Sequence, residues 1–414
     1  MSPSSLSISA TAASGETAAS GDLGLTEDEA GPIRLITDTA SLKEACDRLA
    51  AGDFLALDTE FHRETTYWPQ LCLVQAANDD FDVLVDPLAK DMDLSPLLKL
   101  IADKSRMKVF HAARQDLEIL VRIMGEVPSP VFDTQVAAMA CGLGDSISYE
   151  NLVSRVLKGT IDKSSQFTDW ARRPLSEKQL KYARGDVTYL RRIYIILRDK
   201  LTKLDRLDWI EDEMAALVDP QIYAFDPKQA WKRLKLRKYK NDYLAVLASV
   251  AEWRETVAQE SDKPRGRILK DDAIQEIAQQ RPRSGEAVER LRAVPSGFSR
   301  SRHGQSLVAA INAALADPEK YAPVVERQES HGPPPGALTE LLKVLLKQVA
   351  DENDVATRLI ANASDIERIA REPNPDVAAL RGWRRQVFGE KALALKTGKV
   401  ALAASPNGVR VIEV

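Results

Sequence analysis

The sequence has few cysteines, no long apolar run and little net charge. Its 414 residues include three cysteines, Cys46, Cys72 and Cys141, which are scattered without disulfide or metal-ligand spacing. They fit buried residues in a reducing cytoplasm. No apolar stretch approaches the roughly 20 residues that span a bilayer, so no membrane partner is expected. The formal net charge of −4 argues against a uniformly basic nucleic-acid binder.

Two further absences narrow the function. No basic residue precedes Arg34, and the Ser-, Ala- and Thr-rich start carries several acids. This composition predicts neither a secretory signal nor a transit peptide, so residues 1–31 are expected to form a disordered acidic tail. The pattern Gly-x-x-x-x-Gly-Lys-Ser/Thr is also missing, which excludes a P-loop helicase.

A pair of acidic residues follows a short apolar run. Residues 54–57, Phe-Leu-Ala-Leu, are typical of a buried strand, and Asp58 and Glu60 come directly after them. Because successive strand side chains alternate between faces, the two carboxylates are expected to point the same way. Carboxylates are the ligands that hard divalent cations such as Mg2+ and Mn2+ prefer. Taken alone, the pair would also fit a solvated strand end.

Two later segments carry acidic residues in helical contexts. Asp116 falls near the start of an apolar-periodic helix, where the helix dipole favours a carboxylate. Tyr182 and Asp186 are four residues apart in a helix predicted over about residues 177–204, so they share one face. Taken singly, these residues fit a helix N-terminal charge and an amphipathic helix face. Taken together with the first pair, they predict one metal site assembled from three segments.

The order and context of these residues resemble ribonuclease D, in the tyrosine subclass of the DEDD exonuclease superfamily. Asp58 and Glu60 match the first exonuclease motif, Asp116 the second, and Tyr182 with Asp186 the third. Two further stretches are similar to ribonuclease D in particular: residues 66–75 (Thr-Tyr-Trp-Pro-Gln-Leu-Cys-Leu-Val-Gln) and residues 162–175. The resemblance covers residues 33–320 well and the remainder less clearly.

The resemblance implies a metal-dependent 3′→5′ exoribonuclease that releases 5′-mononucleotides by two-metal-ion hydrolysis. Asp58 would bridge two Mg2+ or Mn2+ ions, Glu60 and Asp186 would complete the first site, and Asp116 would hold the second, largely through water. Tyr182 would orient the attacking water, because a tyrosine with a pKa of about 10 is a poor base at neutral pH. RNA 3′ ends, above all those of transfer RNA precursors, would be the substrate of a monomeric cytoplasmic enzyme.

Two alternatives stay open. A DNA 3′→5′ exonuclease would share the same five residues. The HRDC-like helical region that follows the exonuclease motifs, and the Asp169-Trp170 and Arg173-Pro-Leu175 context, favour RNA instead. A catalytically weak RNA-binding protein would carry a degenerate site, although all five positions are intact. His111 lies near the second motif, but Tyr182 holds the place that a catalytic histidine would need, so His111 is expected to be structural.

The predicted layout is one α/β domain followed by helical domains. Strands and helices over residues 32–207 predict a mixed sheet flanked by helices, similar to the ribonuclease H-like fold that the exonuclease family uses. A linker over residues 208–240 precedes residues 241–325, which resemble the helical HRDC module. Residues 336–414 are expected to form a second, diverged, all-α HRDC-like domain that includes Arg381-Gly-Trp-Arg-Arg385 near its end.

Basic residues are concentrated between residues 228 and 302, where 18 Lys and Arg outnumber 10 Asp and Glu. Phosphate binding needs such a patch, so an RNA-docking surface is predicted there. A solvated helical surface is the alternative, since runs of charge are common on exposed faces. The residues expected to contact RNA are Lys232, Arg233, Lys235, Arg237, Lys238, Lys240, Arg265, Arg267 and Lys270.

Overall fold

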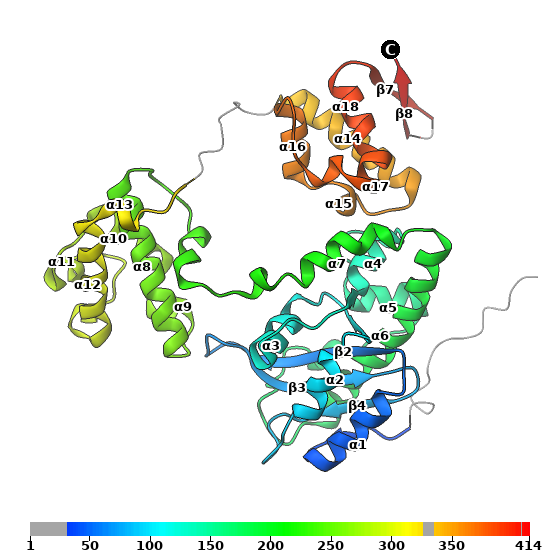
Figure 1. Cartoon of the computed structure of the whole chain (residues 1–414), viewed down its shortest axis with the longest axis horizontal. Helices are drawn as coiled ribbons and strands as arrows, with labels where there is room; N and C mark the ends of the chain where they lie inside the picture. Colours follow the sequence, from blue (N-terminus) through cyan, green and yellow to red (C-terminus); the bar gives the residue numbers. More distant parts are fainter. Residues whose placement is uncertain (1–30, 326–334, 407) are drawn as a thin grey trace, which may run out of the picture.

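The chain folds into an α/β domain (residues 33–207), a connecting segment (residues 208–240), a first helical domain (residues 241–325) and a second helical domain (residues 336–414) (Figure 1). The computed structural model describes residues 31–325, 335–406 and 408–414. The predicted tail therefore lies outside the described residues, apart from Gly31. No helix in the described ranges is long and apolar enough to cross a bilayer.

The α/β domain contains a six-stranded mixed sheet with the order β1-β4-β3-β2-β5-β6. Strands β2, β3 and β4 form an antiparallel meander, whereas the β1–β4, β2–β5 and β5–β6 pairs are parallel. The predicted mixed sheet flanked by helices is therefore confirmed. The strands are β1 (Leu35–Ile36), β2 (Phe54–His62), β3 (Gln70–Ala77), β4 (Asp82–Val85), β5 (Met107–Phe110) and β6 (Val131–Asp133).

Alternate residues of β2 enter the hydrophobic cores on opposite faces of this sheet. Phe54 and Ala56 pack with α4, α5 and α6, whereas Leu55 and Leu57 pack with α1, α2 and α3. The alternation fixes which face Asp58 and Glu60 share, because the side-chain period of a strand is two. The helices are α1 (Thr39–Leu49), α2 (Ser95–Ala102), α3 (Arg114–Met124), α4 (Thr134–Ala140), α5 (Tyr149–Leu157) and α6 (Glu177–Lys203).

Helix α6 begins with a capping box. The Ser176 hydroxyl accepts the backbone N–H of Gln179, and the Gln179 side chain accepts the backbone N–H of Ser176. Such reciprocal bonds satisfy two amide groups that the first turn of a helix leaves unpaired. The helix then continues to Lys203, close to the predicted range, and carries Tyr182 and Asp186 in its first three turns.

The first helical domain is built around α8, which is buried on nearly all sides. Helices α10, α12 and α13 surround it and form a core separate from those of the α/β domain. The connecting segment contributes α7 (Glu211–Leu217) and the short turns η3 (Asp208–Ile210), η4 (Pro220–Tyr223) and η5 (Pro227–Arg233). The helices of the domain are α8 (Asn241–Glu260), α9 (Arg265–Ile268), α10 (Asp271–Gln280), α11 (Gly285–Glu289), α12 (Arg302–Ala316) and α13 (Pro318–Tyr321), with the turn η6 (Phe298–Arg300).

The second helical domain ends in a β-hairpin, so the all-α expectation is incomplete there. Val400, Leu402 and Val411 alternate along the two strands and pack against the helices, which explains why this segment is extended. The elements are α14 (Gly336–Asn353), α15 (Thr357–Ile360), α16 (Ala363–Arg371), η7 (Ala378–Leu380), α17 (Gly382–Arg384), the π-helical turn η8 (Arg385–Gly389), α18 (Glu390–Lys396), β7 (Val400–Ser405) and β8 (Gly408–Glu413).

The second helical domain shares one hydrophobic core with α4, α5 and α6. Trp383 stacks on Trp209 of the connecting segment, with ring centroids 4.1 Å apart and planes 3° from parallel. The buried Arg384 forms ion pairs with Asp212 and Glu213, both at 2.8 Å. The predicted end of an HRDC-like repeat, residues 381–385, therefore forms part of an interface with the rest of the chain.

Candidate active site

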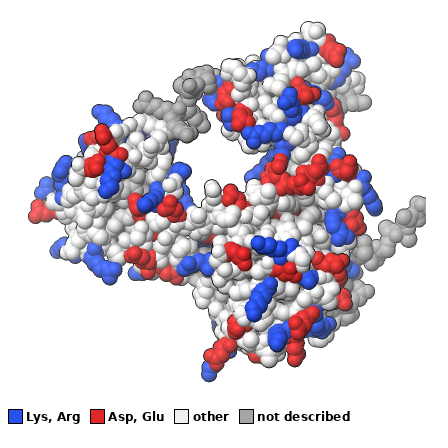
Figure 2. Space-filling view, viewed as in Figure 1, with Lys and Arg blue, Asp and Glu red and all other residues white. Residues whose placement is uncertain are grey.

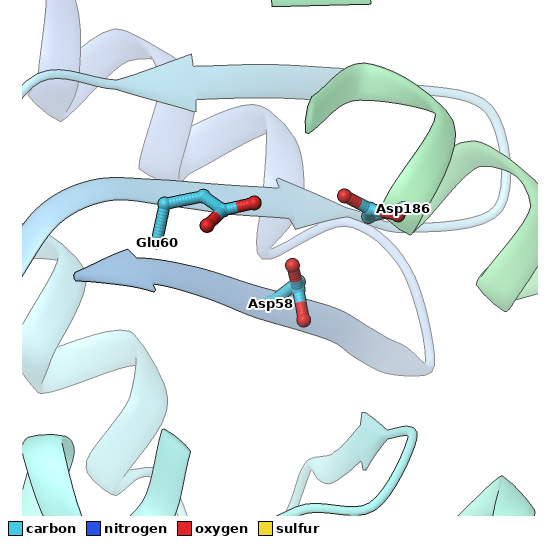
Figure 3. A group of neighbouring side chains, drawn as sticks. All are labelled: Asp58, Glu60 and Asp186. Carbon is cyan, nitrogen blue, oxygen red and sulfur yellow. The ribbon is translucent and has the colours of Figure 1, made fainter. Parts of the chain in front are cut away.

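Three of the four predicted acidic residues come together between β2 and α6 (Figure 3). Asp58 and Glu60 project from β2, and Asp186 projects from the first half of α6. One carboxylate oxygen of each residue lies within 4.8 Å of those of the other two. The strand alternation and the packing of α6 on β2 therefore produce the convergence that the spacing predicts.

Asp116 lies beside this group but is not one of the three. It sits in the first turn of α3, on the opposite face of the sheet from α6, and is 7 % exposed. Thr59, which alternates with Asp58 and Glu60 along β2, donates its hydroxyl to Asp116 Oδ1 at 2.6 Å. Asp116 is therefore held by Thr59, whose side chain points to the opposite face of the sheet from those of Asp58 and Glu60.

Burial is the largest cause of a raised pKa at all four carboxyl groups. It raises the pKa of Glu60 to about 9, with the charges of Asp58 and Asp116 adding to the effect. The pKa values of Asp58 and Asp186 lie well above the usual range, for the same combination of burial and neighbouring carboxylates. The pKa of Asp116 rises to about 7, although its hydrogen bond from Thr59 opposes the shift. The folded protein thus disfavours the ionised form of all four carboxyl groups.

The donor set fits divalent cations. Among the described residues, no ion pair joins any of the four carboxylates to a lysine or arginine, and Asp186 Oδ2 is buried without a hydrogen-bond partner. Buried carboxylates of this kind need a counter-charge, and all-oxygen sites suit Mg2+ and Mn2+. A divalent ion would supply the charge that the protein itself does not place there.

Tyr182 lies one turn before Asp186 on α6 and is half-buried. Its ring packs against that of Trp170, with centroids 6.1 Å apart. Burial, followed by the charges of Asp186, Glu60 and Asp58, raises the pKa of the Tyr182 hydroxyl far above its usual value. The hydroxyl therefore keeps its proton at neutral pH, which suits it to donate a hydrogen bond rather than to act as a base.

Several residues that position the site are not evident in the motifs. The Asp133 carboxylate accepts the backbone N–H groups of Ala112 and Ala113 at 3.0 and 2.9 Å, and so caps the start of α3. The Tyr149 hydroxyl donates to the backbone oxygen of Asp186 at 2.6 Å. No local signal in the sequence marks these contacts, because each one joins elements that are distant along the chain.

The ribonuclease D-like stretch over residues 162–175 packs against the Tyr182 side chain. Arg173 binds Asp86 through two hydrogen bonds of 2.7 and 2.6 Å, and also donates to the backbone oxygens of Cys72 and Trp170. These contacts fix the loop against β3 and place the buried Trp170 beside the Tyr182 ring. This stretch therefore has a structural role in positioning Tyr182.

His111 has two partners away from the carboxylates. Its Nδ1 lies 3.0 Å from the Thr134 hydroxyl, and its Nε2 lies 3.1 Å from the backbone oxygen of Ile147. Burial lowers the pKa of the imidazole, which keeps the ring neutral. These contacts agree with the structural role expected for this histidine.

The nine predicted RNA-contacting residues fall into two groups. Arg265 is only partly exposed and binds Glu255 and the Tyr67 hydroxyl, and Arg233 lies 3.4 Å from Glu255. These two arginines therefore have protein partners, which a run of basic letters does not reveal. Lys and Arg side chains lie among acidic ones on the visible face of the domain (Figure 2). The other seven are exposed: Lys232, Lys235, Arg237, Lys238, Lys240, Arg267 and Lys270.

Comparisons with known proteins agree over the whole described fold. Residues 33–202 match a 3′-5′ exonuclease family model, and residues 243–311 match the HRDC domain model. The chain is 48 % identical to the ribonuclease D of Nitrobacter hamburgensis, over 92 % of this chain and 99 % of that one. It is 45 % identical to the ribonuclease D of Granulibacter bethesdensis, over 91 % and 96 %. The crystal structure of Escherichia coli RNase D, 28 % identical, superposes with a TM-score of 0.74 over 89 % of this chain and 99 % of that one.

Proposed function

The chain belongs to the ribonuclease D family, and from this premise we propose that it hydrolyses RNA with two divalent metal ions held by Asp58, Glu60, Asp116 and Asp186. Membership makes it a hydrolase, a 3′→5′ exoribonuclease that acts on RNA. The observation that carries the metal proposal is the convergence of three carboxyl groups, one oxygen of each lying within 4.8 Å of the other two, with no lysine or arginine of the described residues paired with them.

The four carboxylates would divide between the two ions according to their positions. The charges of Asp186 and Asp116 both raise the pKa of Asp58, so Asp58 would take part in holding the ions together with either of them. Glu60 and Asp186 would complete the donors of one ion, and Asp116, set apart beside Thr59, would serve the other largely through water. When bound, Mg2+ or Mn2+ ions stabilise the attacking and leaving oxygens of an in-line displacement.

Tyr182 would position the attacking water. The hydroxyl is protonated at neutral pH and lies one helical turn from Asp186, so it can donate a hydrogen bond toward the carboxylate group. The Trp170 ring and the loop fixed by Arg173 limit the movement of the Tyr182 ring. A donor held in one place favours one orientation of the attacking water, which lowers the entropic part of the activation barrier.

The RNA would be held outside the site by the first helical domain and by the end of the connecting segment that packs against it. The seven exposed cations between Lys232 and Lys270 would contact phosphates, since phosphate neutralisation supplies most sequence-independent affinity. We propose that the enzyme acts as a monomer on the 3′ ends of structured RNA such as transfer RNA precursors, and releases 5′-mononucleotides.

An assay on matched RNA and DNA oligonucleotides tests this proposal. With Mg2+ or Mn2+, we expect stepwise shortening of the RNA from its 3′ end with release of 5′-mononucleotides, and no shortening in a chelator. Asp186→Asn should be inactive under all conditions. Faster shortening of the DNA would instead indicate a DNA exonuclease, and binding of RNA without shortening would indicate a binding protein.

A further inference from the structure

The loop between the two central strands of the sheet reaches into the first helical domain. Residues 63–69 (the 63–69 loop) join β2 to β3 and include part of the ribonuclease D-like stretch over residues 66–75. Tyr67 is only 3 % exposed and belongs to the hydrophobic core of the first helical domain, not to that of its own domain. A tyrosine of the α/β domain therefore completes the core of its neighbour.

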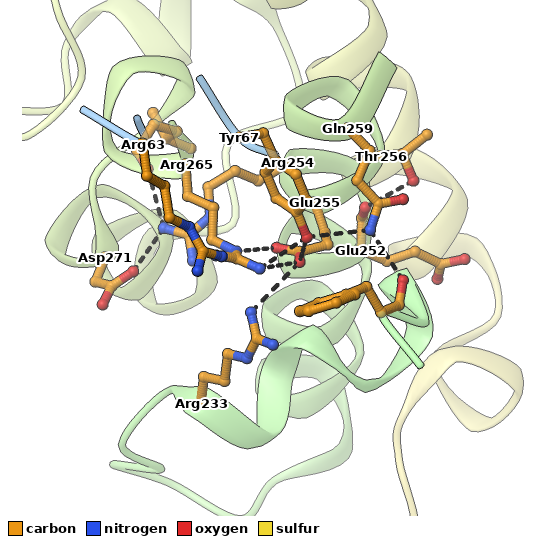
Figure 4. Close-up of polar contacts among 12 residues, drawn as sticks. Arg63, Tyr67, Arg233, Glu252, Arg254, Glu255, Thr256, Gln259, Arg265 and Asp271 are labelled. Atoms are coloured by element: carbon orange, nitrogen blue, oxygen red, sulfur yellow. Dashed lines mark hydrogen bonds and ion pairs between the residues drawn. The ribbon is translucent and has the colours of Figure 1, made fainter. Parts of the chain in front are cut away.

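Hydrogen bonds hold this loop on the first helical domain (Figure 4). The Tyr67 hydroxyl donates to the buried Glu255, and accepts from Arg265 at 2.7 Å and from Gln259 at 3.1 Å. The carboxylate of Asp262 accepts the backbone N–H groups of Tyr67 and Trp68, each at 3.0 Å. The side chains of Glu255 and Gln259 project from one face of α8, one turn apart.

The same loop is fixed on its other side to α3, which carries Asp116. Arg63 forms a 2.7 Å ion pair with Glu118, and the guanidinium of Arg122 lies 4.1 Å from the centre of the Trp68 ring. The loop also continues directly from β2, which carries Asp58 and Glu60. It therefore connects two elements of the metal site to the first helical domain, which bears two of the exposed cations and packs against the end of the connecting segment, which bears the other five.

We propose that the 63–69 loop fixes the position of the first helical domain relative to the active site, and that Tyr67 and Asp262 thereby determine the preference for long over short RNA. This inference rests on the proposed RNA surface of that domain. A long RNA can contact the exposed cations and the metal site at once, and gains affinity only while the two are held at a fixed separation. A short RNA reaches the metal site alone, so its hydrolysis does not depend on the loop.

Two substitutions together remove all five hydrogen bonds between the loop and the first helical domain. Tyr67→Phe removes the hydroxyl and keeps the ring in the core. Asp262→Gly removes the carboxylate without strain, because Asp262 is exposed and has a φ of 47°, which glycine adopts freely. Asp262→Asn is the conservative partner, since asparagine keeps an acceptor oxygen and tolerates a positive φ.

Tyr243→Phe is the matched control. Tyr243 is buried on α8, the helix that also carries Glu255. Its hydroxyl donates to Gln275 at 2.6 Å, within the first helical domain. Its loss also removes a buried tyrosine hydrogen bond and should lower the stability of the domain, but it leaves the contacts of the 63–69 loop intact. Only the Tyr67 change should alter how the two domains are arranged.

The full-length variants are compared by X-ray scattering without metal, and by hydrolysis with metal of a short single strand of roughly five nucleotides and of a hairpin RNA with a single-stranded 3′ end. For Tyr67→Phe/Asp262→Gly we expect a larger radius of gyration. We also expect a KM for the hairpin that is about 10-fold higher, with kcat unchanged, and values for the short strand within about twofold of wild type. The slope of log affinity against log salt should fall by roughly 0.7 to 0.9 per lost phosphate contact.

Tyr67→Phe/Asp262→Asn, which keeps an acceptor at position 262, should have scattering and a hairpin KM closer to wild type than Tyr67→Phe/Asp262→Gly. Tyr243→Phe should leave both unchanged. A double variant that scatters like wild type would overturn the positioning role, and so would a released domain with unchanged hairpin KM and salt slope. An equal loss on both RNAs would place the effect at the metal site instead. Failure of the proposed function is distinguishable, because wild type would then hydrolyse neither RNA while the scattering still differed.

Discussion

Two acidic sites in this protein differ in the direction in which their surroundings shift the carboxyl pKa values. Around Asp58, Glu60 and Asp186, burial and mutual repulsion raise the pKa values, and no lysine or arginine of the described residues pairs with them. At Glu255, burial also opposes ionisation, but hydrogen bonds from Arg265 and Tyr67 and the charge of Arg265 outweigh it. The pKa of Glu255 is therefore held below its usual value.

The difference indicates which buried charges hold the fold together and which are available to a ligand. A carboxylate whose partners are built into the protein stabilises the arrangement of domains, as at Glu255. Carboxylates left without partners destabilise the folded protein until a cation binds, which is typical of functional sites. The same residue type thus has opposite effects on stability in two places, and that contrast can be tested directly.

The largest expected effect comes from neutralising one unpaired carboxylate. Asp186→Asn keeps the shape of the side chain and removes a metal ligand, so we expect activity to fall by at least about 10³-fold, in keeping with the several kcal/mol that bound metals contribute. In a chelator, the free energy of unfolding should rise, because the substitution relieves repulsion at a site where the charge is disfavoured. Rate assays and denaturant titration measure the two effects. A variant that loses activity and stability together would contradict the contrast.

Tyr182→Phe should have the next largest effect. The substitution removes one hydroxyl and leaves the ring packed on Trp170, so the metal ligands and the fold stay in place. Losing one positioned hydrogen bond to the attacking water should lower kcat by roughly 10²-fold, with little change in RNA affinity. Single-turnover rates and RNA binding in a non-hydrolysing buffer separate the two. An unchanged kcat would show that another group positions the water.

The same acid-to-amide change at the paired carboxylate should act in the opposite direction on stability. Glu255→Gln leaves Arg265 without its charged partner, so we expect the free energy of unfolding to fall by about 2 kcal/mol. Glu252→Gln, one turn earlier on α8, is the control, because Glu252 forms no ion pair within the described ranges. Denaturant titration in a chelator compares both with Asp186→Asn. If Glu255→Gln and Asp186→Asn changed the free energy of unfolding in the same direction, the distinction between the two acidic sites would not hold.

The convergence of Asp58, Glu60 and Asp186 could be predicted largely because its signals are local. Two residues apart on a strand and four apart on a helix are spacings that dictate a shared face, and they place Asp58 with Glu60 and Tyr182 near Asp186. The role of Thr59 could not be read in the same way, although it lies between the first two. Its partner, Asp116, is brought to it by the packing of α3 on the opposite face of the sheet.

The domain interfaces could not be predicted, because they depend on partners far apart in the sequence. Residues 66–75 resemble ribonuclease D, but only the structure shows that Tyr67 enters another domain. Arg233 and Arg265 stand among basic residues, and only the fold shows that both lie against Glu255 of the helix between them, α8. The second helical domain likewise shares its core with α4, α5 and α6, so a chain cut after residue 207 would lose part of the core of the α/β domain.

The smallest expected effect is on how stability without metal depends on pH. The pKa of Glu60 is raised from its ordinary value of 4.5 to about 9, and that of Asp116 from 3.8 to about 7. Between about pH 4 and about pH 9 the folded protein therefore binds more protons than the unfolded chain, so the free energy of unfolding should fall as pH rises. Below that window both states are protonated and the penalty is absent.

Magnesium should reverse this trend, because a bound cation favours the ionised carboxylates. At about one hundred times its dissociation constant, Mg2+ should raise Tm by roughly 5 °C at about pH 8, and by less at about pH 5. Thermal melts across pH, with Mg2+ or chelator, measure this, and Asp186→Asn should show a smaller gain. A Tm in chelator that rises steadily over the same window would mean that these carboxylates are already balanced, as Glu255 is, and would remove the electrostatic reason for a cation to bind them.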